Sequence, residues 1–132
     1  MPSWLDTLAD PRPIRAVYGD GVPGLAPVVL HEVCLHRDGP RVTLRFDLPD
    51  FPAEPPRKWL AQQANVVQVA LTLVGIQGIT LSGWTTQPVL DLSLTHEDGT
   101  VVVTGAGSGV RLDIQAEAAT ITSLSAYHNG TR

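Results

Sequence analysis

Four histidines, His31, His36, His96 and His128, are the side chains in this chain best suited to metal binding or to proton transfer near neutral pH. His31 and His36 lie five residues apart in a segment with strand periodicity, so we expect their side chains on opposite faces, where they cannot bind one ion. No Cys-x-x-Cys or His-x-x-x-His spacing is present. The sequence therefore predicts no metal site and no cofactor, and it favours a structural role for His31 at the edge of the core.

Two segments place a histidine beside a carboxylate: His36-Arg37-Asp38-Gly39 and His96-Glu97-Asp98-Gly99. Asp-Gly is also the dipeptide that favours a two-residue hairpin turn, because both central residues of that turn adopt positive φ. Side chains at an exposed turn are solvated, whereas acid–base catalysis requires a fixed geometry. We therefore interpret both segments as turns and predict that the protein is not an enzyme. An enzyme that uses His31 or His96 is our third hypothesis.

The glycine-rich segment Gly105-Ala106-Gly107-Ser108-Gly109 has the composition of a phosphate-binding loop without its context. Val110 stands where a dinucleotide fingerprint needs its third glycine, and the strand-like residues that follow present no helix N-terminus to a phosphate. We interpret the segment as a flexible connection between strands. Cys34 has no activating partner nearby in the sequence and, as the single cysteine, cannot form an internal disulfide.

The preceding observations argue against a metal site, a catalytic site and a phosphate-binding loop. Recognition of another molecule by the protein surface is the function that remains. Trp84 falls on the same side of its predicted strand as Thr80 and Ser82, so it is either an exposed interface anchor or is covered by another segment. The segment from Pro49 to Pro56 contains four prolines and either presents Phe51 to a partner or covers an open sheet edge.

Acidic residues accompany these aromatic residues in two groups. Asp47, Asp50 and Glu54 lie near Phe51 in the sequence, and Asp91, Glu97 and Asp98 form a second group. The candidate partner-binding residues are Asp47, Asp50, Phe51, Glu54 and Trp84. Either acidic group is a candidate surface for contact with a partner.

Composition limits the class of protein. A chain of 132 residues is expected to form a single domain, residues 1–132, with a core that needs no disulfide or metal. The net charge of −4 and the small number of basic residues, Lys58 and eight arginines, argue against nucleic acid as a direct partner. The first nine residues lack the basic and apolar regions of a signal peptide, so we expect a cytoplasmic protein. The uncharged stretch from Trp59 to Leu90 is interrupted too often by glutamine and threonine to span a membrane.

The elements that position these residues are predicted to be strands. Val42, Leu44, Phe46 and Leu48 alternate with polar residues, and the same period recurs over 67–73, 90–94 and 110–114. We predict a mainly β fold, a single antiparallel sandwich or partly open barrel of about eight strands. Ser3 as N-cap and Asp6 three residues later predict a short N-terminal helix that ends before Pro11.

The first predicted hairpin has a defined register. A two-residue turn at Asp38-Gly39 pairs Leu35 with Val42, Val33 with Leu44 and His31 with Phe46, all pointing inward. The opposite face then pairs Glu32 with Arg45, as a cross-strand ion pair, and Cys34 with Thr43.

The order of several short motifs resembles the immunity protein 50 family of bacterial polymorphic toxin systems. The motifs are Asp38-Gly39-Pro40, Phe46-Asp47-Leu48-Pro49, Phe51-Pro52 to Pro56 with Trp59, Asn65, Val67 to Leu73, Gly83-Trp84 and Ser125-Ala126-Tyr127. The resemblance covers roughly Trp4 to Tyr127. It implies a mostly β protein that binds and neutralises a cognate toxin domain in the cytoplasm, without catalysis. It implies no particular binding residues.

A second hypothesis is a small-molecule or carbohydrate-binding β-barrel in which Trp59, Trp84 and Tyr127 line a pocket. A closed interior filled by side chains would argue against it. The oligomeric state is open at this stage, because an exposed sheet edge can pair with another copy or with a toxin.

Overall fold

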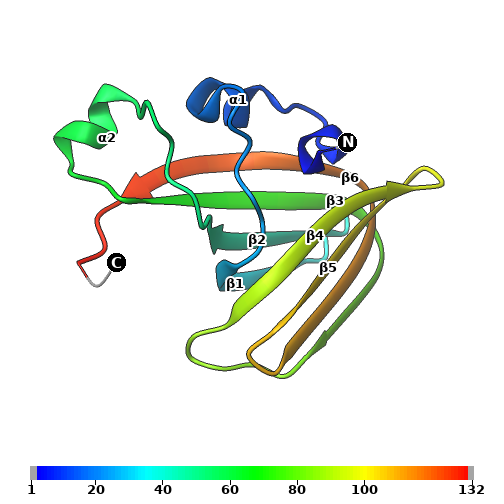
Figure 1. Cartoon of the computed structure of the whole chain (residues 1–132). Helices are drawn as coiled ribbons and strands as arrows, with labels where there is room; N and C mark the ends of the chain where they lie inside the picture. Colours follow the sequence, from blue (N-terminus) through cyan, green and yellow to red (C-terminus); the bar gives the residue numbers. More distant parts are fainter. Residues whose placement is uncertain (1–2, 131–132) are drawn as a thin grey trace.

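A computed structural model describes residues 3–130 of the chain (Figure 1). Within this range lie a 3₁₀ helix, Trp4–Thr7, two α-helices, α1 (Arg12–Tyr18) and α2 (Arg57–Ala61), and six strands, β1 (Val28–His36), β2 (Arg41–Asp47), β3 (Val66–Ser82), β4 (Val89–Glu97), β5 (Thr100–Gly107) and β6 (Val110–Tyr127). The mainly β prediction is confirmed. The first two and last two residues of the predicted domain lie outside the described range.

The strand count of about eight is wrong for a physical reason. β3 and β6 are 17 and 18 residues long, and each extends well beyond the alternating run predicted for it, 67–73 or 110–114. The ladder between them shifts register between Ile76 and Gly78 and then resumes. Such an irregularity bends a strand without ending it. Two long bent strands therefore replace four shorter ones.

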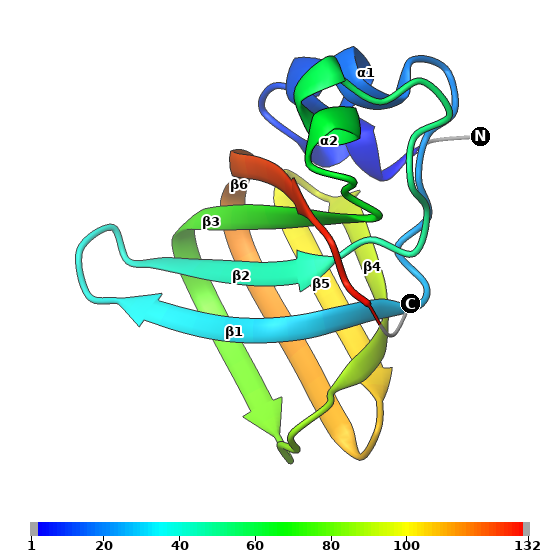
Figure 2. The ribbon, with the colours of Figure 1, turned by 90° about the vertical axis from the view of Figure 1, so that its left-hand side faces the viewer.

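All six strands form one antiparallel sheet in the order β1-β2-β3-β6-β5-β4. The first half of β3 and the last half of β6 continue the β1–β2 layer, and their other halves join β5 and β4 in a second layer that crosses behind it (Figure 2). The ring is completed by only two residue pairs between β1 and β4, Val28 with Leu90 and Val29 with Val89. From Glu32 to His36 no described strand pairs with the outer edge of β1.

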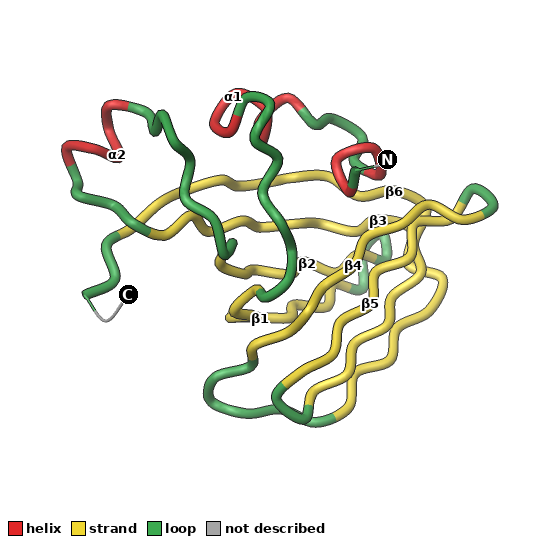
Figure 3. The backbone as a smooth tube through the Cα atoms, viewed as in Figure 1, coloured by secondary structure: helices red, strands yellow, loops and turns green. Residues whose placement is uncertain are grey.

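The interior is filled by one continuous cluster of apolar side chains. The four inward-facing residues predicted for β2 and its end, Val42, Leu44, Phe46 and Leu48, are all buried, as are the alternating apolar residues of 67–73, 90–94 and 110–114. The helices lie together at one end of the ring (Figure 3) and add Leu5, Ile14 and Trp59 to the same cluster. Continuous packing of this kind leaves little reason to expect a ligand inside the ring.

The β1–β2 hairpin follows the predicted register over most of its length. Val33 pairs with Leu44 and Cys34 with Thr43, and the Glu32–Arg45 ion pair is present with an N–O distance of 3.8 Å. The turn differs, because residues 37–40 form a four-residue loop and only Gly39 has positive φ. A two-residue turn would pair Arg37 with Pro40, but Pro40 has no N–H and cannot donate to that pair.

One inward placement in this hairpin is wrong, and a second residue faces inward without being buried. A bulge between Leu30 and Glu32 pairs Phe46 with Leu30, so His31 is displaced from the predicted position. Leu35 does pair with Val42, but its side chain is 61% exposed because no strand lies on its other side. The bulge accounts for His31, and the lack of a neighbouring strand among the described residues accounts for the exposure of Leu35.

Other local predictions are confirmed. Ser3 caps the 3₁₀ helix by accepting a hydrogen bond from the Leu5 N–H (3.1 Å), while Asp6 accepts one from the Ser3 N–H (3.0 Å). Asp98 and Gly99 have φ values of 51° and 79°, as a two-residue hairpin turn requires.

The prediction for the glycine-rich segment is wrong. The segment is not a flexible connection, since Gly105–Gly107 belong to β5 and only Ser108 and Gly109 form the turn. No helix within residues 3–130 has the length and apolar character needed to cross a membrane.

Candidate partner-binding cleft

A cleft of about 800 Å³ opens where the start of β1, the ends of β2 and β6 and the loop from β3 to β4 converge. Figure 2 shows the end of β6 crossing towards the start of β1. Its lining includes two of the five candidate residues, Asp47 and Trp84, and it also includes His31, Val89 and Tyr127. These residues come from five different segments, so only the closed ring brings them together.

Asp47 is the centre of a hydrogen-bond network in the floor of this cleft. The residue is 3% exposed, and its Oδ2 accepts hydrogen bonds from His31 Nε2 (2.8 Å) and from the Tyr127 hydroxyl. Its Oδ1 accepts one from Gln68 Nε2 (3.1 Å), and Gln68 in turn accepts one from Arg45 Nη1 (3.1 Å). An ionised carboxylate only accepts hydrogen bonds, so His31 carries its proton on Nε2 in this contact. Three donors compensate a buried carboxylate that would otherwise be costly.

The bulge in β1 positions His31 for this contact. Leu30 is 1% exposed and occupies the inward site opposite Phe46, which leaves the extra residue free to turn towards the end of β2. Bulges commonly redirect one side chain in this way. The His31 side chain is 33% exposed, so its ring joins the buried carboxylate to the open cleft.

Trp84 forms the apolar rim of the cleft and is 52% exposed. Of the two alternatives predicted for Trp84, exposed or covered by another segment, the structure shows the exposed one. Gly83 precedes it with φ of +74°, and a Cβ there would collide with the Gly109 carbonyl oxygen, so the loop packs directly on the β5–β6 turn. Ser108 Oγ accepts a hydrogen bond from Val89 N–H (3.2 Å) and donates one to the Val89 carbonyl (3.3 Å). The loop is therefore held at both ends.

The proline-rich segment serves as part of the cover over the ring. Phe51 is half-buried, and its ring centroid lies 6.3 Å from that of Trp59, which is 8% exposed. Asp50 is exposed, but its Oδ2 accepts a hydrogen bond from Gly24 N–H (3.0 Å) and its carbonyl accepts one from the Tyr18 hydroxyl (2.7 Å). Burial, with a further contribution from the charge of Asp50, raises the pKa of Tyr18 well above its ordinary value.

The structure thus divides the five candidate residues into two groups. Asp47 and Trp84 line the cleft, whereas Asp50 and Phe51 hold the cover in place, and Glu54 lies exposed on that cover. The pocket of the second hypothesis is likewise divided, because Trp84 and Tyr127 line the cleft but Trp59 packs under the cover. Sequence reasoning did not identify His31 or Tyr127 as partners of Asp47, and no local pattern in the sequence indicated that these residues meet.

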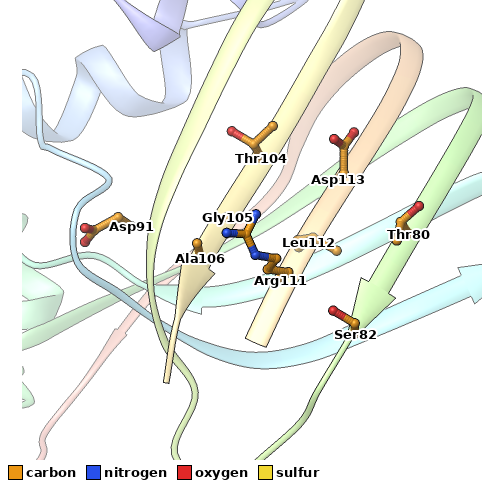
Figure 4. Close-up of a pocket in the computed structure, with 9 residues that line it drawn as sticks. All are labelled: Thr80, Ser82, Asp91, Thr104, Gly105, Ala106, Arg111, Leu112 and Asp113. Atoms are coloured by element: carbon orange, nitrogen blue, oxygen red, sulfur yellow. The ribbon is translucent and has the colours of Figure 1, made fainter. Parts of the chain in front are cut away.

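A second, shallower depression of about 460 Å³ lies on the outer face of the other layer. Figure 4 shows Arg111 extending across β5 between Asp91 on one side and Asp113 and Thr104 on the other. Of the second acidic group, Asp91 lines this depression, and Glu97 and Asp98 are exposed at the end of the β4–β5 hairpin.

The remaining histidines make contacts of a structural kind. His36 Nε2 lies 3.4 Å from Cys34 Sγ, and His128 Nδ1 lies 2.9 Å from the Gln63 carbonyl oxygen. His96 is exposed on β4. Within residues 3–130 no three His, Cys, Asp or Glu side chains are grouped so as to hold a metal ion.

A family model for immunity protein 50 matches residues 10–127, nearly the whole chain. The chain belongs to the immunity protein 50 family. The match includes the cleft residues from His31 to Tyr127 and the full ring of strands. No curated protein and no solved structure matches the chain significantly. Membership of an immunity protein family implies a protein partner, in general a toxin.

Proposed function

We propose that this protein is a cytoplasmic immunity protein of a bacterial polymorphic toxin system, which binds and neutralises a cognate toxin domain by direct contact and without catalysis. Family membership supports the class of partner. The observation that carries the proposed binding site is Trp84, a large aromatic side chain that is 52% exposed at the rim of a cleft. Exposed aromatic anchors at the centre of an interface commonly supply much of its binding energy.

The surroundings of Trp84 suit a preorganised site. Its loop is held by Gly83 against Gly109 and by Ser108 against Val89, so binding a partner orders few additional residues. Val89 is 38% exposed beside it and enlarges the apolar area. The Asp47 network gives the floor of the cleft polar atoms whose positions are fixed by three hydrogen bonds. Specific interfaces commonly bury an apolar core and surround it with polar groups, so we assign Trp84 and Val89 to the core of the contact and the Asp47 network to its polar surroundings.

The His31–Asp47 pair invites an enzymatic interpretation, which the contacts do not favour. A histidine that acts as general base needs a nucleophile or a substrate proton within hydrogen-bond reach. Among the described residues no serine, threonine or cysteine side chain hydrogen-bonds to His31, and Cys34 lies against His36 instead. His31 is therefore assigned a positioning role in the floor of the cleft.

The test is co-expression with the toxin domain encoded immediately upstream of the gene. Wild-type protein is expected to protect the host and to form a complex with the toxin. Trp84→Ala is expected to weaken toxin binding by about 30-fold, which corresponds to a loss of about 2 kcal/mol at an interface anchor. Leu60→Ala is the matched control, because Leu60 is also a large apolar side chain, 60% exposed, but lies on α2.

Three outcomes would count against parts of this proposal. Absence of both protection and a complex with wild-type protein would refute the immunity function. Full affinity of Trp84→Ala would place the toxin elsewhere on the surface. If purified protein altered the toxin covalently, and His31→Gln abolished that change while retaining the complex, the protein would be an enzyme.

A further inference from the structure

The outer edge of β1 is unpaired over most of its length. β1 pairs with β4 only through Val28 and Val29, whereas on its other side it pairs with β2 as far as His36. From Glu32 to His36 the described chain places no strand against this outer edge. Figure 2 shows β1 as the outermost strand of its layer. An edge of this kind presents free backbone N–H and C=O groups that can pair with another strand.

The side chains along this edge alternate regularly after the bulge. Val33 and Leu35 share the inner face with their buried partners Leu44 and Val42. Leu35 is 61% exposed although Val42 beside it is only 2% exposed, so one side of Leu35 lacks a neighbour. On the outer face lie Glu32, Cys34 and His36.

We propose that this edge pairs antiparallel with the same edge of a second copy of the chain, with Cys34 of each copy on the two-fold axis. Antiparallel neighbours point to the same face, so the register must pair inner residues with inner ones and outer with outer. In the proposed register Val33 pairs with Leu35 of the second copy, and Glu32 pairs with His36 of the second copy. Both pairs occur twice because of the two-fold symmetry.

The two neighbouring registers lack this complementarity. Shifting the second copy by two residues in one direction places Arg37 opposite Val33, and shifting it in the other direction places His31 opposite Leu35. Each shift therefore sets a polar side chain against an apolar one. The proposed register also extends an existing ion pair. Glu32 Oε2 already lies 3.8 Å from Arg45 Nη2 on β2, and His36 of the second copy would lie on the opposite side of Glu32.

A second copy fits this edge better than an unrelated strand because the edge is complementary to itself. The pairing with β4 ends at Val29, and after the bulge at His31 the regular β1–β2 ladder runs without interruption from Glu32 to His36. Pairing of this stretch across a two-fold axis would bury Leu35 and join the two β1–β2 layers into one continuous sheet. This inference is independent of the proposed function, and its tests need no toxin.

Sedimentation equilibrium of the full chain over a range of concentrations tests the dimer. Wild-type protein is expected to shift from monomer to dimer mass, and Leu35→Lys is expected to raise the dimer dissociation constant at least tenfold. Leu60→Lys is the matched control, since Leu60 is equally exposed but lies on α2. Circular dichroism verifies that each variant is folded. Monomeric wild-type protein at every concentration, or an unchanged dissociation constant for Leu35→Lys, would overturn the proposal.

A charge exchange tests the register. Glu32→Lys and His36→Glu are each expected to weaken the dimer. The double variant, which carries both substitutions in each copy, places a lysine opposite a glutamate across the axis and is expected to recover most of the affinity. Additive weakening in the double variant would contradict this register.

Cys34 supplies an independent probe of the two-fold axis. Directly opposite residues in an antiparallel pair have Cβ atoms about 4.5–5.5 Å apart, close enough for a disulfide after small adjustments. Diamide, which takes up the two electrons and two protons released by two thiols, is expected to convert wild-type protein to a covalent dimer at least tenfold faster than Leu35→Lys. Cys34→Ser is expected to give no covalent dimer. Equal rates for wild type and Leu35→Lys would indicate random collision and would contradict the proposed interface.

Discussion

Asp47 offers the sharpest test of how the cleft is built. Its carboxylate is 3% exposed and accepts hydrogen bonds from His31, Gln68 and Tyr127. Asp47→Ala removes all three acceptor contacts at once. Hydrogen bonds to a charged group contribute about 1.5–3 kcal/mol each, but removing the charge also removes its desolvation cost. His31 is 33% exposed and regains water, so we expect a net loss of about 3 kcal/mol in the free energy of unfolding.

Asp47→Asn changes the hydrogen-bond network but keeps the volume of the side chain. Its single carbonyl oxygen can accept from His31 and Tyr127, but its amide then faces the Gln68 amide, and Gln68 cannot turn without losing Arg45. One contact is lost instead of three, so we expect a loss of about 1–2 kcal/mol.

Urea unfolding followed by circular dichroism and tryptophan fluorescence measures both changes. Glu54→Ala is the control, because Glu54 is exposed, and its effect should stay within about 0.5 kcal/mol. If Asp47→Ala lost no more stability than Glu54→Ala, the carboxylate would contribute nothing net to the fold and the reasoning would be refuted.

Three further predictions address the loop, the core and the cover. Gly83→Ala should destabilise the fold by more than the roughly 1–2 kcal/mol that left-handed φ alone costs, because its Cβ meets the Gly109 carbonyl. Gly99→Ala should cost only that amount, because Gly99 has similar φ but open space around it. Urea unfolding of both variants tests the difference. Leu71→Ala should lose about 2–5 kcal/mol since Leu71 is fully buried, and equal midpoints for Leu71→Ala and the exposed-site variant Leu60→Ala would contradict the packing. The raised pKa of Tyr18 means that the folded state holds this proton more tightly, so stability should be complete below the ordinary tyrosine pKa of about 10 and should fall above it. Tyr18→Phe should reduce that alkaline fall in thermal unfolding, and an unchanged fall would assign it to other groups.

Much of the local structure follows from neighbouring residues alone. The alternation in β2 predicts which side of the strand is buried, since period 2 and burial on one face determine each other. Ser3 and Asp6 predict the first helical turn because the capping contacts lie within four residues. Asp98-Gly99 predicts its turn because both residues accept positive φ. The helices α1 and α2 were not predicted, because each is short and depends on packing of Ile14 or Trp59 into the common core.

The same reasoning fails where contacts are distant in the sequence. Periodicity could not show that β3 bends and continues past Gly75 and Gly78, because a bend and a strand end have similar glycine signals. Periodicity also placed His31 inward, because alternation alone does not reveal a bulge. The bulge puts Leu30, instead of His31, opposite Phe46.

The sequence by itself determined the class of fold, the faces of the strands, the cap and the Asp98-Gly99 turn, because these rest on φ preferences and hydrophobic alternation over a few residues. Only the tertiary structure decided that Asp47 meets Tyr127, 80 positions later, that Trp84 stands exposed over them, and that the edge of β1 is left unpaired. Those outcomes depend on how the ring closes, and closure through two pairs between β1 and β4 is a balance of packing across the whole sheet that no short segment encodes.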